Sequence, residues 1–204
     1  MMLDRRSLIL GAAANAVLAG CTATMPPPVP ATPRAALLIA AARAQIGVTT
    51  RYDAAYTLLP FPNGDVSRDK GACTDVIVRA YRDAFGLDLQ VLVNQDMRSA
   101  FAAYPGLWGL DHPDPSIDHR RVPNLRAWLA RKGGALPIPQ DGTGWRPGDI
   151  FTSGNGNRNT HIGLVSDRRG VYGPLIIHNV GWGVHEEDAL LASPVTGRYR
   201  WSID

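Results

Sequence analysis

The strongest constraint on the fold is a run of apolar residues with helical spacing that begins at Cys73. Apolar side chains recur three and four residues apart, at positions 73, 76, 77, 80, 81, 84 and 85, and Gly86 ends the run. This spacing predicts an amphipathic helix whose first turn contains Cys73. Unpaired backbone N–H groups and the positive end of the helix dipole at that turn favour a thiolate over a thiol. The alternative is a small apolar residue that begins the buried face.

Three further helices are expected in the first two thirds of the chain. They are predicted over about 33–46 behind the N-cap Thr32, over about 94–104 behind the N-cap Asn94, and from Pro123 to the glycines at 133–134. Between the last two, the stretch 111–121 contains two prolines and no helical period, so it is expected to be a loop.

The last third of the chain changes to strand character. Residues 161–166 and 175–180 are short apolar runs, and the segment 167–174 between them predicts a hairpin. A shorter strand is expected at 150–151, after a turn. Antiparallel pairing would place His161 opposite a residue in the range 178–180, and the register decides whether His178 or Asn179 shares its face. Either side chain could hold the His161 ring toward a thiolate.

The first 21 residues predict export and lipid attachment. Arg5 and Arg6 precede an apolar run over 7–19 that is too short to span a bilayer core. The run ends in Leu-Ala-Gly-Cys at 18–21, which resembles a bacterial lipoprotein signal cut before Cys21. The paired arginines also resemble a twin-arginine signal, so the Sec and twin-arginine routes both stay open.

These signals divide the chain into a signal peptide over 1–20, a lipidated Pro-rich tether over 21–33 and one domain over 34–204. We expect a periplasmic protein anchored to a membrane by lipid at Cys21. Thr22 does not resemble the aspartate that retains lipoproteins in the inner membrane, which favours the outer membrane. Acylation of Cys21 would leave Cys73 without a disulfide partner.

Composition and motif spacing exclude several classes of function. The chain has 21 Lys and Arg against 18 Asp and Glu, an imbalance too small to indicate nucleic-acid binding. Two histidines and three aspartates lie in the loop over 111–119, but without the spacing of a metal motif. His185 precedes three acidic residues, at 186–188, that are interpreted as a solvated turn. We therefore expect a monomer with no cofactor and no metal.

The order of cysteine at a helix start, histidine on one strand and histidine or asparagine on the next is that of the thiol triad in papain-like hydrolases. The chain resembles the NlpC-type cell-wall cysteine peptidases and, within that group, the bacterial domain-of-unknown-function family 1287. The resemblance covers roughly residues 36–200. It rests on Gly-Ala-Cys-Thr-Asp-Val-Ile-Val-Arg-Ala-Tyr-Arg at 71–82, Asp-His-Arg-Arg-Val-Pro-Asn-Leu at 118–125, Pro-Gly-Asp-Ile at 147–150, His-Ile-Gly-Leu-Val-Ser-Asp at 161–167 and Gly-Arg-Tyr-Arg at 197–200.

This resemblance implies an α+β, papain-like fold in which N-terminal helices pack on a small antiparallel sheet. It also implies that Cys73 is the nucleophile, His161 the general base and His178 the orienting residue. Many NlpC-type enzymes carry an acidic residue directly before the nucleophile, and that position is Ala72 here. The further candidates for the cleft or for orienting the base are Tyr52, Asp75, Asp118, His119, Arg120, Arg121 and Asn179.

The sequence therefore predicts an exported, lipid-anchored cysteine peptidase or amidase that cleaves an amide bond in peptidoglycan (murein) stem peptide. Backbone N–H groups at the helix start, including that of Cys73, would stabilise the oxyanion. One alternative is a lipoprotein that binds murein or an envelope partner without catalysis. Another is an acyl or peptidyl transferase that uses the same triad.

Overall fold

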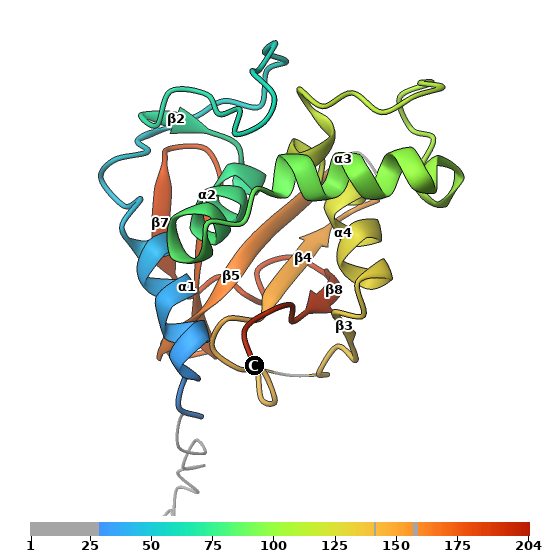
Figure 1. Ribbon diagram of the computed structural model, residues 1–204. Helices are drawn as coiled ribbons and strands as arrows, with labels where there is room; N and C mark the ends of the chain where they lie inside the picture. Colours follow the sequence, from blue (N-terminus) through green and yellow to red (C-terminus); the bar gives the residue numbers. More distant parts are fainter. Residues whose placement is uncertain (1–28, 141, 157–158) are drawn as a thin grey trace, which may run out of the picture.

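The fold is a layer of helices on one face of an antiparallel sheet (Figure 1). A computed structural model describes residues 29–140, 142–156 and 159–204 of the chain. The expectations for the signal peptide, for Cys21 and for residues 21–28 of the tether lie outside the described residues. Among those described, no helix is both long enough and apolar enough to cross a membrane.

The described elements begin with helices and end with strands. The helices are α1 (Pro33–Arg43), α2 (Cys73–Phe85), α3 (Leu89–Ser99) and α4 (Val122–Arg131), with short 3₁₀ turns η1 (Phe101–Ala103) and η2 (Asp118–Arg120). The strands are β1 (Arg51–Tyr52), β2 (Lys70–Gly71), β3 (Ala135–Leu136), β4 (Ile150–Gly154), β5 (Thr160–Arg169), β6 (Pro174–Asn179), β7 (Val184–Glu187) and β8 (Val195–Tyr199). The prediction of helices and an antiparallel sheet is confirmed.

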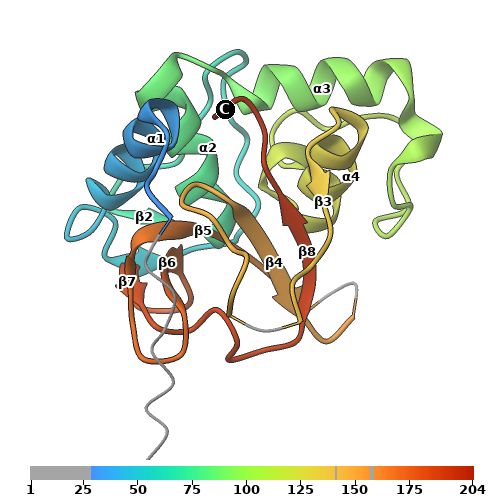
Figure 2. The same ribbon diagram turned by 90° about the horizontal axis from the view of Figure 1, so that it is seen from below.

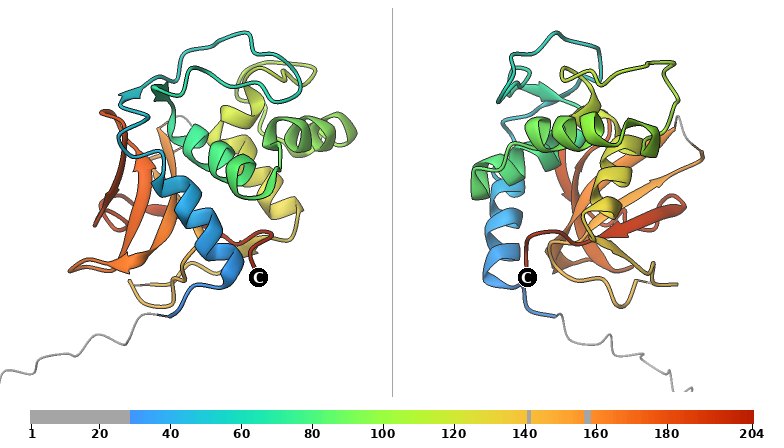
Figure 3. Two further views of the ribbon diagram at one scale, coloured as in Figure 1. Left: turned by 60° about the vertical axis from the view of Figure 1, so that its left-hand side comes forward. Right: turned by 45° about the vertical axis from the view of Figure 1, so that its right-hand side comes forward.

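The main sheet has the strand order β3-β8-β4-β5-β6-β7, with every neighbouring pair antiparallel. Helices α1, α2 and α4 pack against β5, and the side view in Figure 3 shows them on the same face of the sheet. The main core fills this interface. The opposite face buries a second, smaller cluster composed of Trp145, Phe151, Val165, Ile176 and Leu190. Successive residues of a strand point to opposite faces, so those of β5 and β6 alternate between the main core and the second cluster.

Helix α2 has the predicted limits. It begins at Cys73 and ends at Phe85, and Gly86 follows in the left-handed conformation with φ of 66°. At its start, the Asp75 carboxylate accepts the N–H of Ala72 at 2.6 Å. This contact satisfies one of the backbone donors that a helix start leaves unpaired.

Two other predicted helices have different limits. Helix α1 ends at Arg43, because the N–H groups of Gln45 and Ile46 donate to carbonyls three residues back instead of four. The prediction that Asn94 caps a helix reaching Tyr104 was wrong. Helix α3 begins at Leu89, whose side chain is buried, and its N-cap is Asp88, which accepts the N–H of Gln90 at 3.0 Å. The helix ends at Ser99.

The predicted hairpin between β5 and β6 resolves the question of register. Leu164 pairs with Ile177, so residues 161, 163 and 165 share a face with residues 176 and 178. That is the face of the second, smaller cluster. His178 therefore lies on the same side of the sheet as His161, and Asn179 points to the helical layer.

The two ends of the described chain meet beside the helices. Figure 2 shows the C-terminal end next to α1 and α2. The Thr32 hydroxyl, which also accepts the N–H of Ala35 as the N-cap of α1, donates to the Ile203 carbonyl at 2.5 Å. The Tyr81 hydroxyl of α2 donates to the Trp201 carbonyl at 2.8 Å. The C-terminal segment is thus bound to the start of α1 and to α2.

A buried aspartate joins the segments 147–150 and 197–200. Asp149, from Pro-Gly-Asp-Ile, is fully buried and pairs with Arg198 at 2.8 Å and with Arg200 at 2.6 Å, both from Gly-Arg-Tyr-Arg. Its Oδ2 also accepts the N–H of Arg146 at 3.0 Å. These blocks therefore hold β4, β8 and the preceding turn together.

We predict that Asp149→Asn lowers the free energy of unfolding by about 3 kcal/mol, because removing one member of a buried ion pair strands the other charges. The two arginines keep some access to solvent, which places the value at the lower end of the usual range. Urea unfolding followed by circular dichroism measures it. Asp111→Asn, at a side chain that is 94% exposed, is the control, and equal midpoints for the two variants would contradict the prediction.

Candidate active site

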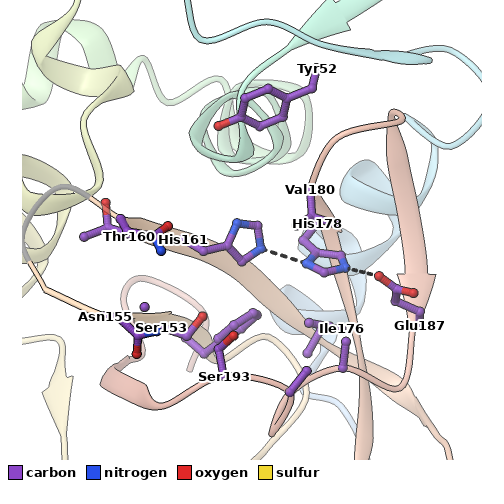
Figure 4. Close-up of a pocket in the computed structure, with 15 residues that line it drawn as sticks. Tyr52, Ser153, Asn155, Thr160, His161, Ile176, His178, Val180, Glu187 and Ser193 are labelled. Atoms are coloured by element: carbon purple, nitrogen blue, oxygen red, sulfur yellow. Dashed lines mark hydrogen bonds and ion pairs between the residues drawn. The ribbon is translucent and has the colours of Figure 1, made fainter.

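Two histidines and a glutamate form a row across three neighbouring strands. Nε2 of His161 on β5 lies 2.7 Å from Nδ1 of His178 on β6, and Nε2 of His178 lies 2.7 Å from Oε1 of Glu187 on β7. Figure 4 shows the three side chains in line along one wall of a hollow of about 380 Å³. The structure therefore brings together two of the three residues of the predicted triad.

The glutamate fixes the direction of these hydrogen bonds. A carboxylate only accepts, so His178 carries its proton on Nε2 and presents Nδ1 as an acceptor. His161 then donates from Nε2, and its Nδ1 is left as the basic nitrogen. Among the described residues, no hydrogen-bond partner occupies that nitrogen.

Gly163 makes room for this arrangement. It lies on the same face of β5 as His161, directly opposite Phe151 on β4. A Cβ atom at this position would lie 2.6 Å from the Phe151 ring and 3.0 Å from Cβ of His178. A side chain here would push His178 away from the sheet, which explains the glycine in the His-Ile-Gly-Leu block.

Cys73 is buried at the start of α2, beside the same strand. The Tyr52 hydroxyl and the backbone N–H groups of Ile162 and Thr74 act to lower the pKa of this thiol. Burial nevertheless dominates and, with a smaller contribution from the Asp75 charge, raises the pKa of the thiol to about 11. The expectation of a lowered thiol pKa is therefore wrong for the resting protein, because the expected helix-start stabilisation is outweighed by loss of water.

The cysteine and the histidines line two hollows that adjoin. Cys73 lines one of about 620 Å³, and His161 and His178 line the other, while Tyr52 and Thr160 line both. No hydrogen bond joins the Cys73 sulfur to His161 among the described residues. Helix α2 packs on β5, and Thr160, the neighbour of His161, lines the hollow of the thiol as well as that of the histidines.

Desolvation lowers the pKa of His161 to about 4, with a smaller contribution from His178. The ring is therefore neutral near pH 7 and able to accept a proton. Burial also lowers the pKa of His178, although Glu187 opposes this shift. At rest the site consists of a neutral thiol and a neutral imidazole.

Three of the further candidates make contacts that hold the segments around Cys73 in place. The carboxylate of Asp75 forms a buried ion pair with Arg120, through two contacts of 2.9 Å. Arg120 also donates to the carbonyls of Asp53 and Ala55, so it is a structural residue. Asn179 donates to the Gly71 carbonyl at 2.8 Å and so positions the chain just before Cys73.

The segment around η2 contains the remaining candidates. Asp118 accepts hydrogen bonds from Arg121 at 2.9 Å and from the N–H of Asp114 at 2.6 Å, as expected for a loop held by polar contacts. His119 is buried away from the histidine row, and desolvation lowers its pKa to about 4. Of these residues, Arg120 and Arg121 line the hollow that contains Cys73.

Glu187 is the functional residue that the sequence analysis missed. The acidic run at 186–188 was interpreted as a solvated turn, which was wrong, because Glu186 and Glu187 belong to β7. Strand β7 pairs His178 with His185, so Glu187 lies diagonally across from His178 on the same face. A second hairpin, turning at the Gly-Trp-Gly of 181–183, was the available signal.

The fold and the site define a mixed α/β protein with a buried cysteine beside a histidine-histidine-glutamate row. The chain belongs to the family described as Domain of unknown function (DUF1287), whose model matches residues 39–201. It is similar to the Uncharacterized protein YijF of Escherichia coli (strain K12), with 46% identity over 165 residues, which are 79% of each chain. No solved structure matches the chain.

We predict that alkylation of Cys73 by iodoacetamide is slow at pH 7 and accelerates up to pH 9 without a plateau, because the raised pKa keeps the thiol protonated. Peptide mapping by mass spectrometry measures the rate at this residue alone. The guanidinium-unfolded protein is the control and should approach its plateau near the ordinary cysteine pKa of about 8.5. A plateau below pH 8 in the folded protein would instead indicate a preformed thiolate.

Proposed function

We propose that this protein is a cysteine peptidase or amidase that cleaves an amide bond, with Cys73 as nucleophile and His161 as general base. The observation that carries the proposal is the histidine row, which leaves Nδ1 of His161 unprotonated beside the hollow of the thiol. A papain-like fold of the NlpC type is part of the proposal. Its support is the order of elements, with the cysteine at a helix start and the histidine on the following sheet.

The chemistry follows from the protonation states. When substrate enters, Nδ1 of His161 takes the proton from the Cys73 sulfur as that sulfur attacks the amide carbonyl carbon. The carbonyl π electrons move to oxygen, and the N–H of Cys73, which has no acceptor among the described residues, can donate to the oxyanion. Collapse expels the amine, which receives the proton from His161. Water then hydrolyses the thioester and regenerates the thiol.

Glu187 contributes in the charged states. The positive charge that forms on His161 during attack is next to His178, whose other nitrogen donates to the carboxylate. The negative charge of Glu187 thus stabilises the imidazolium through one intervening ring. Glu187 also offsets part of the desolvation that lowers the pKa of His178.

Murein stem peptide is the substrate class we favour, and the protein would act from a lipid anchor in the periplasm. The support is the signal-like pattern before Cys21 and the two adjoining hollows with polar groups in their walls. A binding protein without catalysis is the second candidate. The raised pKa of the Cys73 thiol favours this second candidate, as does the absence, among the described residues, of a hydrogen bond between the sulfur and His161.

We predict that the wild-type protein releases new amine groups and carboxylates from purified murein, and that Cys73→Ala lowers the rate by about 10⁴-fold or more. Chromatography of the soluble products and mass spectrometry measure the reaction. The circular dichroism spectrum of the variant checks its fold. Equal release by the two proteins would exclude Cys73 as nucleophile, and no release by either would favour the binding protein.

We predict that Glu187→Gln lowers kcat/KM about tenfold and moves the acid limb of the pH profile to lower pH. The carboxylate raises the pKa of His178, so its loss makes the coupled histidines less basic. Glu186→Gln is the matched control, because Glu186 lies on the other face of β7 and pairs with Arg43 at 2.7 Å. A pH profile that moves equally in both variants would contradict the positioning role.

A further inference from the structure

The hollow that contains Cys73 extends from the candidate nucleophile to an arginine and a tryptophan. Its volume is about 620 Å³, and Trp108, Arg120 and Arg121 line it together with the thiol. The Thr74 hydroxyl, next to Cys73, donates to the Arg120 carbonyl at 2.9 Å and ties the two sides of the hollow together. A ligand with its carbonyl at the thiol would therefore extend toward these arginines.

The two arginines differ in the hydrogen bonds that they have left to make. The guanidinium of Arg120 donates to both oxygens of Asp75 and to two backbone carbonyls, which leaves it one N–H donor. The guanidinium of Arg121 donates through Nη1 to Asp118 at 2.9 Å and makes no other hydrogen bond within the described residues. A guanidinium has five N–H donors, so most of those of Arg121 remain available.

The Arg121 guanidinium is also held in place. Its central carbon lies 4.1 Å from the centre of the Trp108 ring. Asp118, which pairs with it, is fixed in turn by the N–H of Asp114 at 2.6 Å and by the Asn124 amide at 3.2 Å. Stacking and pairing together fix the plane of the fork, which lowers the entropy lost when a planar anion binds.

The walls around Arg121 favour an anion over a cation. The hollow is lined by the starts of α2 and α4, and the residues preceding these helices, Ala72 and Arg121, provide no capping side chain. Within the described part of the chain, no Asp or Glu side chain lines it. Ala72 adds no negative charge beside Cys73, so the two helix starts and the Arg121 guanidinium make this side of the hollow favourable for an anion.

We propose that Arg121, held by Trp108 and Asp118, is the carboxylate-binding subsite of the cleft. The substrate class is an amide that carries a free carboxylate on the side of the scissile bond nearest Arg121, and this inference rests on the proposed function. Arg121 binds the carboxylate through two parallel N–H bonds. Trp108 acts through Arg121 as a positioning residue.

The test is the binding of two synthetic murein stem peptides to the full-length Cys73→Ala protein, by isothermal titration calorimetry. One peptide has free carboxylates and the other has them converted to carboxamides. We expect the free acid to bind about tenfold more tightly, as charge-assisted hydrogen bonds to an arginine fork require. Adding Arg121→Gln should abolish the difference, and Arg121→Lys should restore only part of it, because lysine keeps the charge without the fork.

Arg98→Gln is the matched control, since it removes the same charge from an exposed position on α3. It should retain the full difference between the peptides. Equal affinity of the two peptides, a difference that survives Arg121→Gln in a folded protein, or no measurable binding of the free acid would each overturn the subsite. Absence of hydrolysis by the wild type would overturn only the proposed function, because this binding assay does not require turnover.

Discussion

The buried ion pair between Asp75 and Arg120 is the contact on which the cleft depends. Asp75 holds the start of α2 through the Ala72 N–H and holds η2 through the guanidinium, while Arg120 reaches the backbone that follows β1. Three segments far apart in the sequence therefore meet at one ion pair. Removing either charge would leave the other buried without a partner, at a cost of about 3 to 5 kcal/mol. The positions of Cys73, Tyr52 and Arg121 all depend on this pair.

The limits of α2 and the β5–β6 hairpin could be predicted because their patterns are local. A stripe of apolar residues ended by glycine determines a helix, and two apolar runs around a turn determine a hairpin. The partner of His161 could not be predicted, since a shift of one residue in pairing exchanges His178 for Asn179. Strand β7 was missed because it is short, polar and at the edge of the sheet, so that its residues look like a turn.

The protonation state of Cys73 and the different roles of the two arginines could not be predicted from the sequence, for another reason. At the sequence level, a cysteine at a helix start is expected to ionise easily, and adjacent arginines at 120 and 121 look equivalent. The structure separates both cases by tertiary contacts. Burial outweighs the expected stabilisation of the thiolate, and Asp75 with two backbone carbonyls takes four donors of Arg120, while Arg121 gives only one, to Asp118. Desolvation and the pairing of hydrogen-bond donors depend on segments that are distant in the chain, so no local pattern encodes them.

Strand β6 is connected to both halves of the proposed chemistry. Its residue 178 orients the base on one face of the sheet, and the neighbouring residue 179 holds the Gly71 carbonyl, two residues before the nucleophile, on the other. Two consecutive residues of one strand therefore help to position the imidazole and the thiol. The hydrogen bond from Asn179 to the Gly71 carbonyl opposes a small displacement of the start of α2 over the sheet, where the thiol must stay aligned with the imidazole. The outer helices could still adjust to a bound ligand.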